Sequence, residues 1–549
     1  MLKKYVQDLK SEFIGYDGKA LSKDVMTGLT VAAVALPLAL AFGVSSGVDA
    51  ASGLITAIFA GIFIASFSGA SFQISGPTGA MAAILLPLSA KYGINGVLTA
   101  GLLSGIILLI AASFKIGKLV SFIPAPVITG FTSGIAIVIA LGQIDNFFGT
   151  VSKGENVIEK LSSYATLGFS PNWSAVLIGA LVVLIMVFYP KKWNAFVPSS
   201  LAGIVIALGL NLILFPEASQ SLVNEVGAIP RTLISNNALI FNGIEFENVK
   251  NLILPAVSIA LLGMIESLMC GASGSKMNGE QFDSNRELVA QGFGNILIPL
   301  VGGVPATAAI ARTSVAIKSG GRTRLVSIVH SLTLIASMFL LGSVMSRIPL
   351  SALAGVLLVT AFRMNEWESI KQIFSNKFKS QIIQYLITML CTVVFDLTVA
   401  IAVGIVIAMI AFVMRSCELN IAVSDVDPDR MPEDLEYDHS HTKVAYLSGP
   451  IFFGTQEKLA NFADEIENTK TLVLSMRGVP IIDGNGIDAL AQMVCKLKAK
   501  KVDVLLCGVQ EQVERELDRV PFTELLSDEK LYWDAVEALK SVNDIKMTA

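Results

Sequence analysis

The chain has 549 residues, of which 53% are hydrophobic and only 15% are charged. Roughly a quarter of the residues in a soluble domain are charged, so most of this chain is predicted to lie in a membrane. The net charge is −4 and the sequence has no basic stripe, so we expect no nucleic-acid partner. The five cysteines show no paired spacing, which argues against a disulfide framework or a zinc site.

The uneven distribution of charge indicates two domains of different class. The apolar segments between residues 24 and 415 are nearly free of charge, so this region is predicted to be a transmembrane domain. Residues 1–23 lack the apolar core of a signal peptide and are expected to form a cytosolic N-terminal segment. Residues 416–440 are predicted to be an acidic linker, and residues 441–549 a small cytosolic domain.

The apolar segments predict fourteen transmembrane spans, which start near residues 24, 51, 74, 96, 121, 173, 196, 250, 288, 305, 324, 349, 380 and 397. Lysine and arginine are far more frequent in the loops on the N-terminal side of the membrane than in those on the other side. Because basic loops stay inside, the N-terminus and the C-terminal domain are predicted to be cytosolic. The predicted fold class is therefore a polytopic α-helical membrane protein.

Two short spans, the third and the tenth, are predicted to be broken helices at corresponding places. Pro77 and Pro305 each follow a glycine-containing turn and are predicted to open a helix there. Pro305 follows Pro77 by 228 residues (305 − 77), and two halves of seven spans make the second an inverted repeat of the first. Helix starts at bilayer depth are tolerated where they face a cavity, and their free N–H groups can bind an anion.

Glu266 is an ionisable side chain deep in a predicted span. Such a group is expensive in a membrane and is a candidate for holding a cation or carrying a proton. Pairing with Arg312 for packing alone is the alternative. Arg312 could balance the charge of an anion, pair with Glu266, or extend to the cytosolic surface.

Hydroxyls and small residues surround the two predicted helix starts. Thr78 and Thr307 could donate hydrogen bonds there, although such threonines often bond to their own helix. Glycine and alanine let the two spans approach closely, so we expect a narrow pocket that suits a small, compact anion.

The C-terminal residues switch to an α/β pattern. Residues 444–447, 471–476 and 502–507 are predicted to be buried strands, and residues 454–467 and 484–498 helices. Asp483 is predicted to cap the second of these helices. Neither a nucleotide-binding loop nor a catalytic constellation is visible, so we do not expect an enzyme.

These features resemble the SulP (sulfate permease) family of anion transporters along essentially the whole chain, and the tail resembles the STAS domain that closes such proteins. The matching motifs are Ser75-Gly76-Pro77-Thr78, Gly302-Gly303 through Arg312-Thr313, Gly320-Gly321-Arg322-Thr323-Arg324, and Asp283-Ser284-Asn285-Arg286-Glu287-Leu288. Residues 284–287, within the last of these motifs, are expected to be polar and cytosolic.

The resemblance implies seven plus seven inverted spans, divided into a transport bundle and a gate, which usually work as a dimer by an elevator-like movement. It places the substrate between the starts of spans 3 and 10. The implied substrate-binding residues are Gly76, Pro77, Thr78, Gly79, Ala308, Ala309, Ile310 and Arg312. Bacterial bicarbonate members hold sodium at positions that correspond here to Glu266, Cys270, Ala308, Ala309 and Ile310.

Departures from the family pattern bear on the substrate. Leu38 stands where many sulfate and chloride members have glutamine, and Ala309 and Ala311 stand where they have serines. The chain therefore looks closer to bacterial bicarbonate and C4-dicarboxylate members. The loop that starts at Asp483 lacks the serine of phospho-switch domains, which favours a docking or gating role for the tail.

We therefore expect a sodium-coupled transporter of bicarbonate or carbonate in a bacterial inner membrane. No cofactor other than the coupling ion is expected. The alternatives are a proton-coupled carrier of succinate, fumarate or aspartate, a sulfate transporter, and a membrane sensor whose tail docks a partner. The expected partners are a small inorganic anion, membrane lipid, a second copy of the chain, and a possible cytosolic regulator of the tail.

Overall fold

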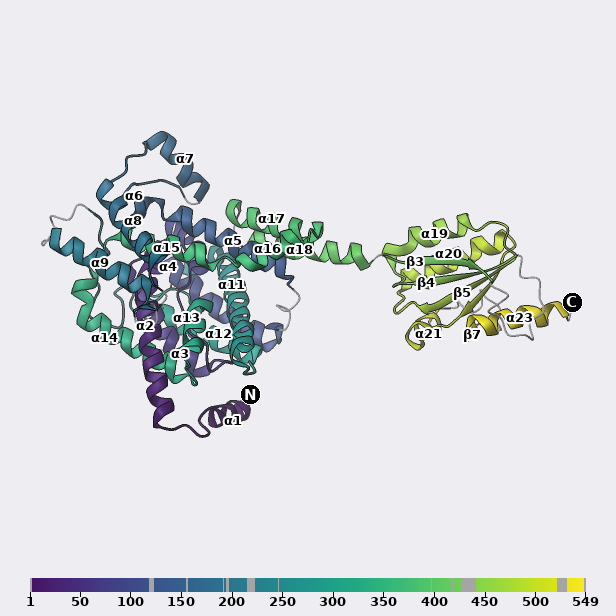
Figure 1. The fold of residues 1–549 in the computed structure, drawn as a ribbon, viewed down its shortest axis with the longest axis horizontal. Helices are drawn as coiled ribbons and strands as arrows, with labels where there is room; N and C mark the ends of the chain where they lie inside the picture. The colour runs from purple at the N-terminus through teal and green to yellow at the C-terminus, as the bar shows by residue number, and fades with distance from the viewer. Residues whose placement is uncertain are drawn as a thin grey trace. The chain divides into compact units, whose positions relative to one another are not determined.

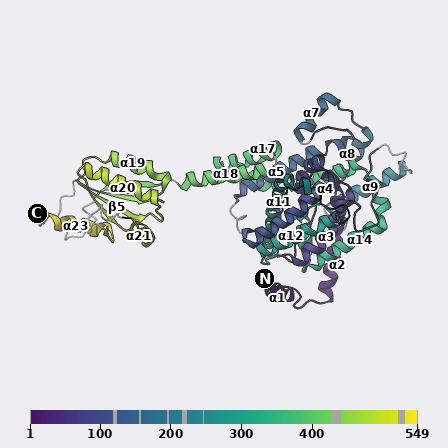
Figure 2. The same ribbon diagram turned by 180° about the vertical axis from the view of Figure 1, so that it is seen from behind.

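The computed structural model describes residues 2–117, 123–154, 157–190, 192–193, 197–214, 223–244, 246–395, 397–416, 418–426, 441–520 and 531–547. The chain divides into two compact units, Met1–Ile405 and Val406–Ala549, and each is described by itself. Figures 1 and 2 show the first unit as an assembly of packed helices and the second as a sheet flanked by helices.

Every predicted span corresponds to a helix of the structure. The helices are α2 (Gly18–Ser45), α3 (Ala50–Phe67), α4 (Gly79–Ser113), α5 (Ala125–Gly142), α8 (Trp173–Phe188), α9 (Ser199–Leu214), α11 (Phe246–Asn278), α12 (Ser284–Leu300), α13 (Ile310–Lys318), α14 (Leu325–Met345), α15 (Leu350–Met364), α17 (Lys379–Val394) and α18 (Leu397–Ser416). Gly93, with φ of 66°, divides α4 into the third and fourth spans. In the described part of the chain, six helices are long and apolar enough to cross a membrane unaided.

Shorter helices connect the spans or lie outside them. They are α1 (Leu2–Glu12), α6 (Ile144–Phe148), α7 (Val157–Leu167), α10 (Leu239–Asn242) and α16 (Trp367–Ser375). In both views α7 lies at the periphery of the helical unit.

The helices of the first unit pack in two groups. Helices α2, α3, α4, α11, α12, α13 and α14 contact one another, and we call this group the bundle. Helices α5, α8, α9, α15 and α17 form a second group, which we call the gate. Glycines permit close helix packing within the bundle, because a Cβ on Gly105 of α4 would lie 2.6 Å from the backbone oxygen of Gly292 in α12.

Two short strands cross inside the bundle. Strand β1 (Ser75–Gly76) pairs antiparallel with β2 (Thr307–Ala308), so that Ser75 faces Ala308. The pairing satisfies backbone groups that neither helix could satisfy at this depth. Helix α4 begins just after β1, and α13 begins just after β2.

The structure corrects the predicted role of the two prolines. Pro77 precedes the N-cap Thr78 and does not occupy the first helical position of α4. Pro305 lies before β2, and α13 begins only at Ile310, after the N-cap Ala309. Sequence spacing aligned Pro305 with Pro77, but the extended residues of β2 separate Pro305 from its helix.

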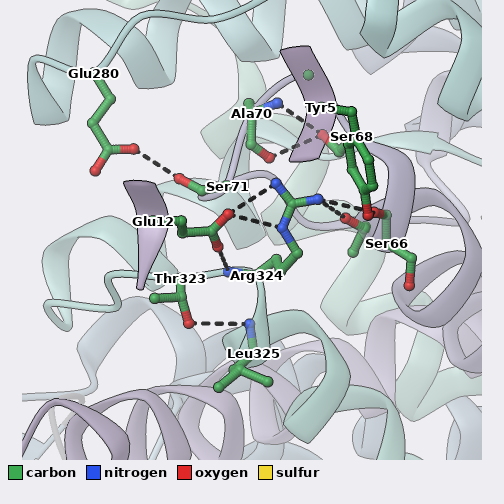
Figure 3. A network of polar contacts seen from close by, with 12 residues as sticks. Tyr5, Glu12, Ser66, Ser68, Ala70, Ser71, Glu280, Thr323, Arg324 and Leu325 are labelled. Carbon is green, nitrogen blue, oxygen red and sulfur yellow. Dashed lines mark hydrogen bonds and ion pairs between the residues drawn. The ribbon is translucent and has the colours of Figure 1, made fainter. Parts of the chain in front are cut away.

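An N-terminal clasp fastens α1 to the ends of α3 and α14 (Figure 3). We define it as Tyr5 and Glu12 of α1 together with Arg324 and Ser66. Arg324 forms an ion pair with Glu12 at 2.9 Å, and both side chains are buried, with 6% and 7% exposed. The Tyr5 hydroxyl and Arg324 Nη1 both donate to the carbonyl oxygen of Ser66, at 2.8 and 2.9 Å.

Replacing Glu12 by glutamine is expected to lower the free energy of unfolding by about 3 kcal/mol, because the buried Arg324 charge loses its partner. Thermal unfolding of the purified protein measures this change. The control is Glu280→Gln, since Glu280 is an exposed carboxylate that accepts a hydrogen bond from Ser71 at 2.7 Å. Equal melting temperatures for the two variants would contradict a stabilising clasp.

Within its described residues, the second unit contains a five-stranded sheet in the order β3-β4-β5-β6-β7. Strand β3 runs antiparallel to β4, and the other neighbouring pairs are parallel. The elements are β3 (Asn420–Asp425), β4 (Thr442–Ser448), the 3-10 helix η5 (Phe453–Thr455), α19 (Gln456–Glu465), β5 (Thr471–Gly478), α20 (Gly484–Ala499), β6 (Asp503–Cys507), α21 (Glu511–Leu517), β7 (Leu531–Tyr532) and α23 (Ala535–Met547).

Side chains alternate between the two faces of this sheet. Leu472 and Leu474 of β5 pack in one core with α19, α20 and α21, whereas Val473 packs in a second core with Ala538 of α23. The predicted strands and helices are confirmed, and Asp483 caps α20 by accepting from the Gly486 N–H at 2.7 Å. The expected linker differs from the structure, because β3 occupies its first part; residues 427–440 lie outside the described part of the chain.

Candidate anion site

A cavity of about 390 Å³ lies against the starts of α4 and α13. The bundle contributes residues of α2, α4, α11 and α13, and the gate contributes residues of α5 and α15. Its lining includes Leu38, Phe42, Thr78, Gly79, Phe131, Thr132, Ile135, Glu266, Met269, Ala308, Ala309, Ile310, Ala311, Arg312, Leu357, Thr360, Arg363 and Glu366.

Thr78 connects the start of α4 to α11. As the N-cap residue, its side-chain oxygen accepts from the Met81 N–H at 3.3 Å. The same hydroxyl donates to Glu266 Oε2 at 2.9 Å. Thr78 therefore caps the start of α4 and also fixes the position of the Glu266 carboxylate.

Replacing Thr78 by valine is expected to reduce anion affinity about tenfold, or about 1.4 kcal/mol, because both hydrogen bonds are lost. The affinity is measured as the anion concentration that gives half-maximal uptake into proteoliposomes. Thr78→Ser retains the hydroxyl and should stay within about twofold of the wild type. A wild-type affinity for the valine variant would exclude Thr78 from the site.

Glu266 lies at the wall of the cavity and has no close basic partner. Among the described residues, no basic nitrogen lies within 4.0 Å of its carboxylate. It accepts a hydrogen bond from a neutral hydroxyl, that of Thr78. Glu266 and Arg312 therefore form no direct ion pair, although their charges attract each other, and the carboxylate can interact with a cation.

Arg312 turns back toward the crossing strands. The residue is 2% exposed, so the alternative in which it extends to the surface is wrong. Its Nη2 donates to the Pro77 carbonyl at 2.6 Å, whereas the buried Nη1 has no hydrogen-bond partner among the described residues. Gly76 leaves room for this guanidinium, because a Cβ there would lie 2.4 Å from Nη1. The positive charge is thus held beside the start of α4.

Hydroxyls of α11 and β2 lie behind the lining of the cavity. The Ser267 hydroxyl accepts from the Ala308 N–H at 3.2 Å and lies 3.0 Å from the Thr307 hydroxyl oxygen. Cys270 is one turn further along α11, and its Sγ donates to Thr313 Oγ1 at 3.3 Å. These bonds hold α11 against β2 and α13.

The structure brings most of the predicted site residues to one cavity. Those that line it are Thr78, Gly79, Glu266, Ala308, Ala309, Ile310 and Arg312. Gly76, Pro77 and Cys270 are not part of the lining and support it from behind.

The gate wall was missed from the sequence. On the gate side, the cavity is lined by Phe131, Thr132 and Ile135 of α5 and by Leu357 and Thr360 of α15. These residues belong to ordinary apolar spans, and nothing in their local pattern distinguishes them from a packed core. Their role follows only from the packing of α5 and α15 opposite α4 and α13.

A cavity at the starts of two helices that follow short paired strands, bordered by a carboxylate and a guanidinium, is typical of a secondary transporter. Comparison with known proteins agrees with this class. Residues 21–388 match the sulfate permease family and residues 436–538 match the STAS domain. The chain therefore belongs to the sulfate permease (SulP) family of anion transporters, and a STAS domain follows its membrane part.

Relatives with different names align over most of their length. The chain is 32% identical to YvdB of Bacillus subtilis, named as a sulfate transporter, over 92% of this chain and 95% of that protein. It is 31% identical to the bicarbonate transporter BicA of Picosynechococcus, over 94% of each chain.

Solved structures show the same fold. The transmembrane domain of a cyanobacterial BicA aligns with a TM-score of 0.64 at 28% identity, covering 72% of this chain and 98% of that one. The murine Slc26a9 anion transporter, solved in an inward-facing state, aligns with a TM-score of 0.85 at 17% identity, covering 98% of this chain and 94% of that one.

Proposed function

We propose that the chain is a sodium-coupled symporter of bicarbonate or carbonate. The observation that carries this proposal is the placement of the Glu266 carboxylate in the same cavity as the starts of α4 and α13, without a basic partner within 4.0 Å among the described residues. The name of the BicA relatives and the alanines at 309 and 311 support bicarbonate over sulfate.

Coupling has a simple electrostatic reason at this site. The two helix starts together supply about one positive charge, since each carries about half a charge. Arg312 adds a further positive charge beside the start of α4, and the Glu266 carboxylate would offset part of this total and weaken the attraction for an anion. A sodium ion bound by Glu266, with Cys270 and the main chain of residues 308–310 as the further proposed ligands, would restore the attraction. The cation and the anion would then bind together.

A proton-coupled carrier of C4-dicarboxylates is the second candidate. The cavity volume of about 390 Å³ favours it, because an inorganic anion would occupy only a small part of that space. The second guanidinium in the lining, Arg363, could contact a second carboxylate. In this case a proton on Glu266 would take the place of sodium.

The division into bundle and gate supports the proposed mode of movement. Both helix starts belong to the bundle, so an elevator-like displacement of the bundle against the gate would carry the bound ions together. We further propose a dimer in a bacterial inner membrane, with the N-terminus and the STAS domain in the cytosol, where the STAS domain could dock a regulator.

Uptake of labelled bicarbonate into proteoliposomes, with and without an inward sodium gradient, tests the proposal. Sodium-driven uptake that succinate does not inhibit is the expected result. Succinate uptake driven by a proton gradient, without bicarbonate uptake, would overturn the leading proposal in favour of the second candidate. Sulfate uptake is measured in parallel, because the relative YvdB carries that name.

A further inference from the structure

Helix α12 carries a stripe of polar side chains that the proposed chemistry does not use. Glu287, Gln291 and Asn295 follow one another at intervals of four residues, so they share one face of the helix. Each is at most 1% exposed. Within the polar segment 284–287, the side chain of Glu287 is completely buried. Buried polar groups in a membrane helix are expensive and point to a function.

Asn295 binds the chain immediately before β2. Its Nδ2 donates to the Ala306 carbonyl at 2.9 Å, and its Oδ1 accepts from the Ala306 N–H at 2.7 Å. The side-chain amide therefore pairs with both polar groups of Ala306, as a neighbouring strand would do. A third bond, from Nδ2 to the Gln291 carbonyl at 3.0 Å, fixes the orientation of the amide.

Gln291 binds the other strand. Its Nε2 donates to the Ser75 hydroxyl of β1 at 3.1 Å and to Glu287 Oε1 at 2.8 Å. Glu287 in turn accepts from the Ser68 hydroxyl at 2.6 Å and the Gly69 N–H at 3.0 Å, in the segment that leads from α3 to β1. One face of α12 thus contacts β1, the residue immediately before β2, and the segment before β1.

We infer that Asn295 and Gln291 are positioning residues for anion binding, an inference that rests on the proposed function. Neither residue lines the cavity. They set β1 and β2 relative to one rigid helix, and α4 and α13 begin directly after these strands. Because an anion must contact both helix starts at once, a small displacement of either strand weakens binding.

Asn295→Ala tests the inference in the full-length protein, and Asn211→Ala is the matched control. Asn211 of α9 is also fully buried, and its Nδ2 also donates to a backbone carbonyl, that of Arg347, at 3.1 Å. It belongs to the gate and does not line the cavity. Both variants should melt at a lower temperature than the wild type. Only Asn295→Ala should raise the concentration for half-maximal uptake, by about tenfold.

Anion binding is also measured directly, as the rise in melting temperature with bicarbonate, sulfate or succinate. Asn295→Ser retains one polar group and should bind with intermediate affinity, and Gln291→Leu should weaken binding as Asn295→Ala does. Wild-type affinity in Asn295→Ala and Gln291→Leu, or an equal loss in Asn211→Ala, would overturn the inference. If succinate alone raises the melting temperature of the wild-type protein, the bicarbonate proposal is contradicted. The succinate affinities of the variants then still decide the role of α12.

Discussion

Replacing Glu266 by glutamine is expected to abolish the sodium dependence of uptake and to reduce the sodium-driven rate about 100-fold. At an effective dielectric constant of about 20, unit charges about 5 Å apart interact by about 3 kcal/mol. This energy corresponds to about a 100-fold change in cation affinity. Glutamine has nearly the same shape as glutamate and can still accept the hydrogen bond from Thr78, so the variant removes mainly the charge.

Glu366→Gln is the matched control for this experiment. Glu366 is a second carboxylate in the lining of the cavity, on the gate side, and its contact with the Thr129 hydroxyl is long, at 3.5 Å. We expect this variant to retain sodium stimulation. Undiminished sodium stimulation in Glu266→Gln would remove Glu266 as the cation ligand. If Glu266→Gln instead loses proton-driven uptake, Glu266 is the residue that carries the coupled proton.

Replacing Arg312 by glutamine is expected to reduce anion affinity by about 100-fold. The substitution removes the buried positive charge beside α4 and the bond of Nη2 to the Pro77 carbonyl, so the cavity becomes more negative. Arg312→Lys keeps the charge but loses the planar group that contacts both Gly76 and Pro77. We therefore expect the anion affinity of the lysine variant to lie between those of the wild type and the glutamine variant.

The measured quantity is again the concentration for half-maximal uptake, together with the melting temperature. Arg363→Gln serves as the control, because Arg363 lines the same cavity but donates to the Met186 carbonyl and the Ser199 hydroxyl. With bicarbonate as the anion, this control should lower the melting temperature without a large change in affinity, because only a dicarboxylate would need Arg363. If Arg312→Gln behaves in the same way, Arg312 has only a structural role.

Most of the fold could be predicted from the sequence because long apolar segments report on the membrane directly. The span starts, the α/β tail and the Asp483 cap depend on local composition and periodicity, which act within one or two turns of chain. Glu266 could be predicted as a site residue for the same reason, because a carboxylate within an apolar span is unusual whatever its partner is. The role assigned to Pro305 was wrong because its helix begins only after a strand that pairs with a distant segment.

The sequence by itself determined the class of this protein, its membrane segments and the carboxylate at its centre. Only the tertiary structure decided what Arg312 contacts, which gate residues face the site, and which polar side chains of α12 hold the two strands. Burial at Glu287 and the partners of Asn295 depend on residues far away in the chain, such as Ser68 and Ala306. Hydropathy records the preference of a segment for lipid, whereas the partner of a buried polar group is set by which helices pack together.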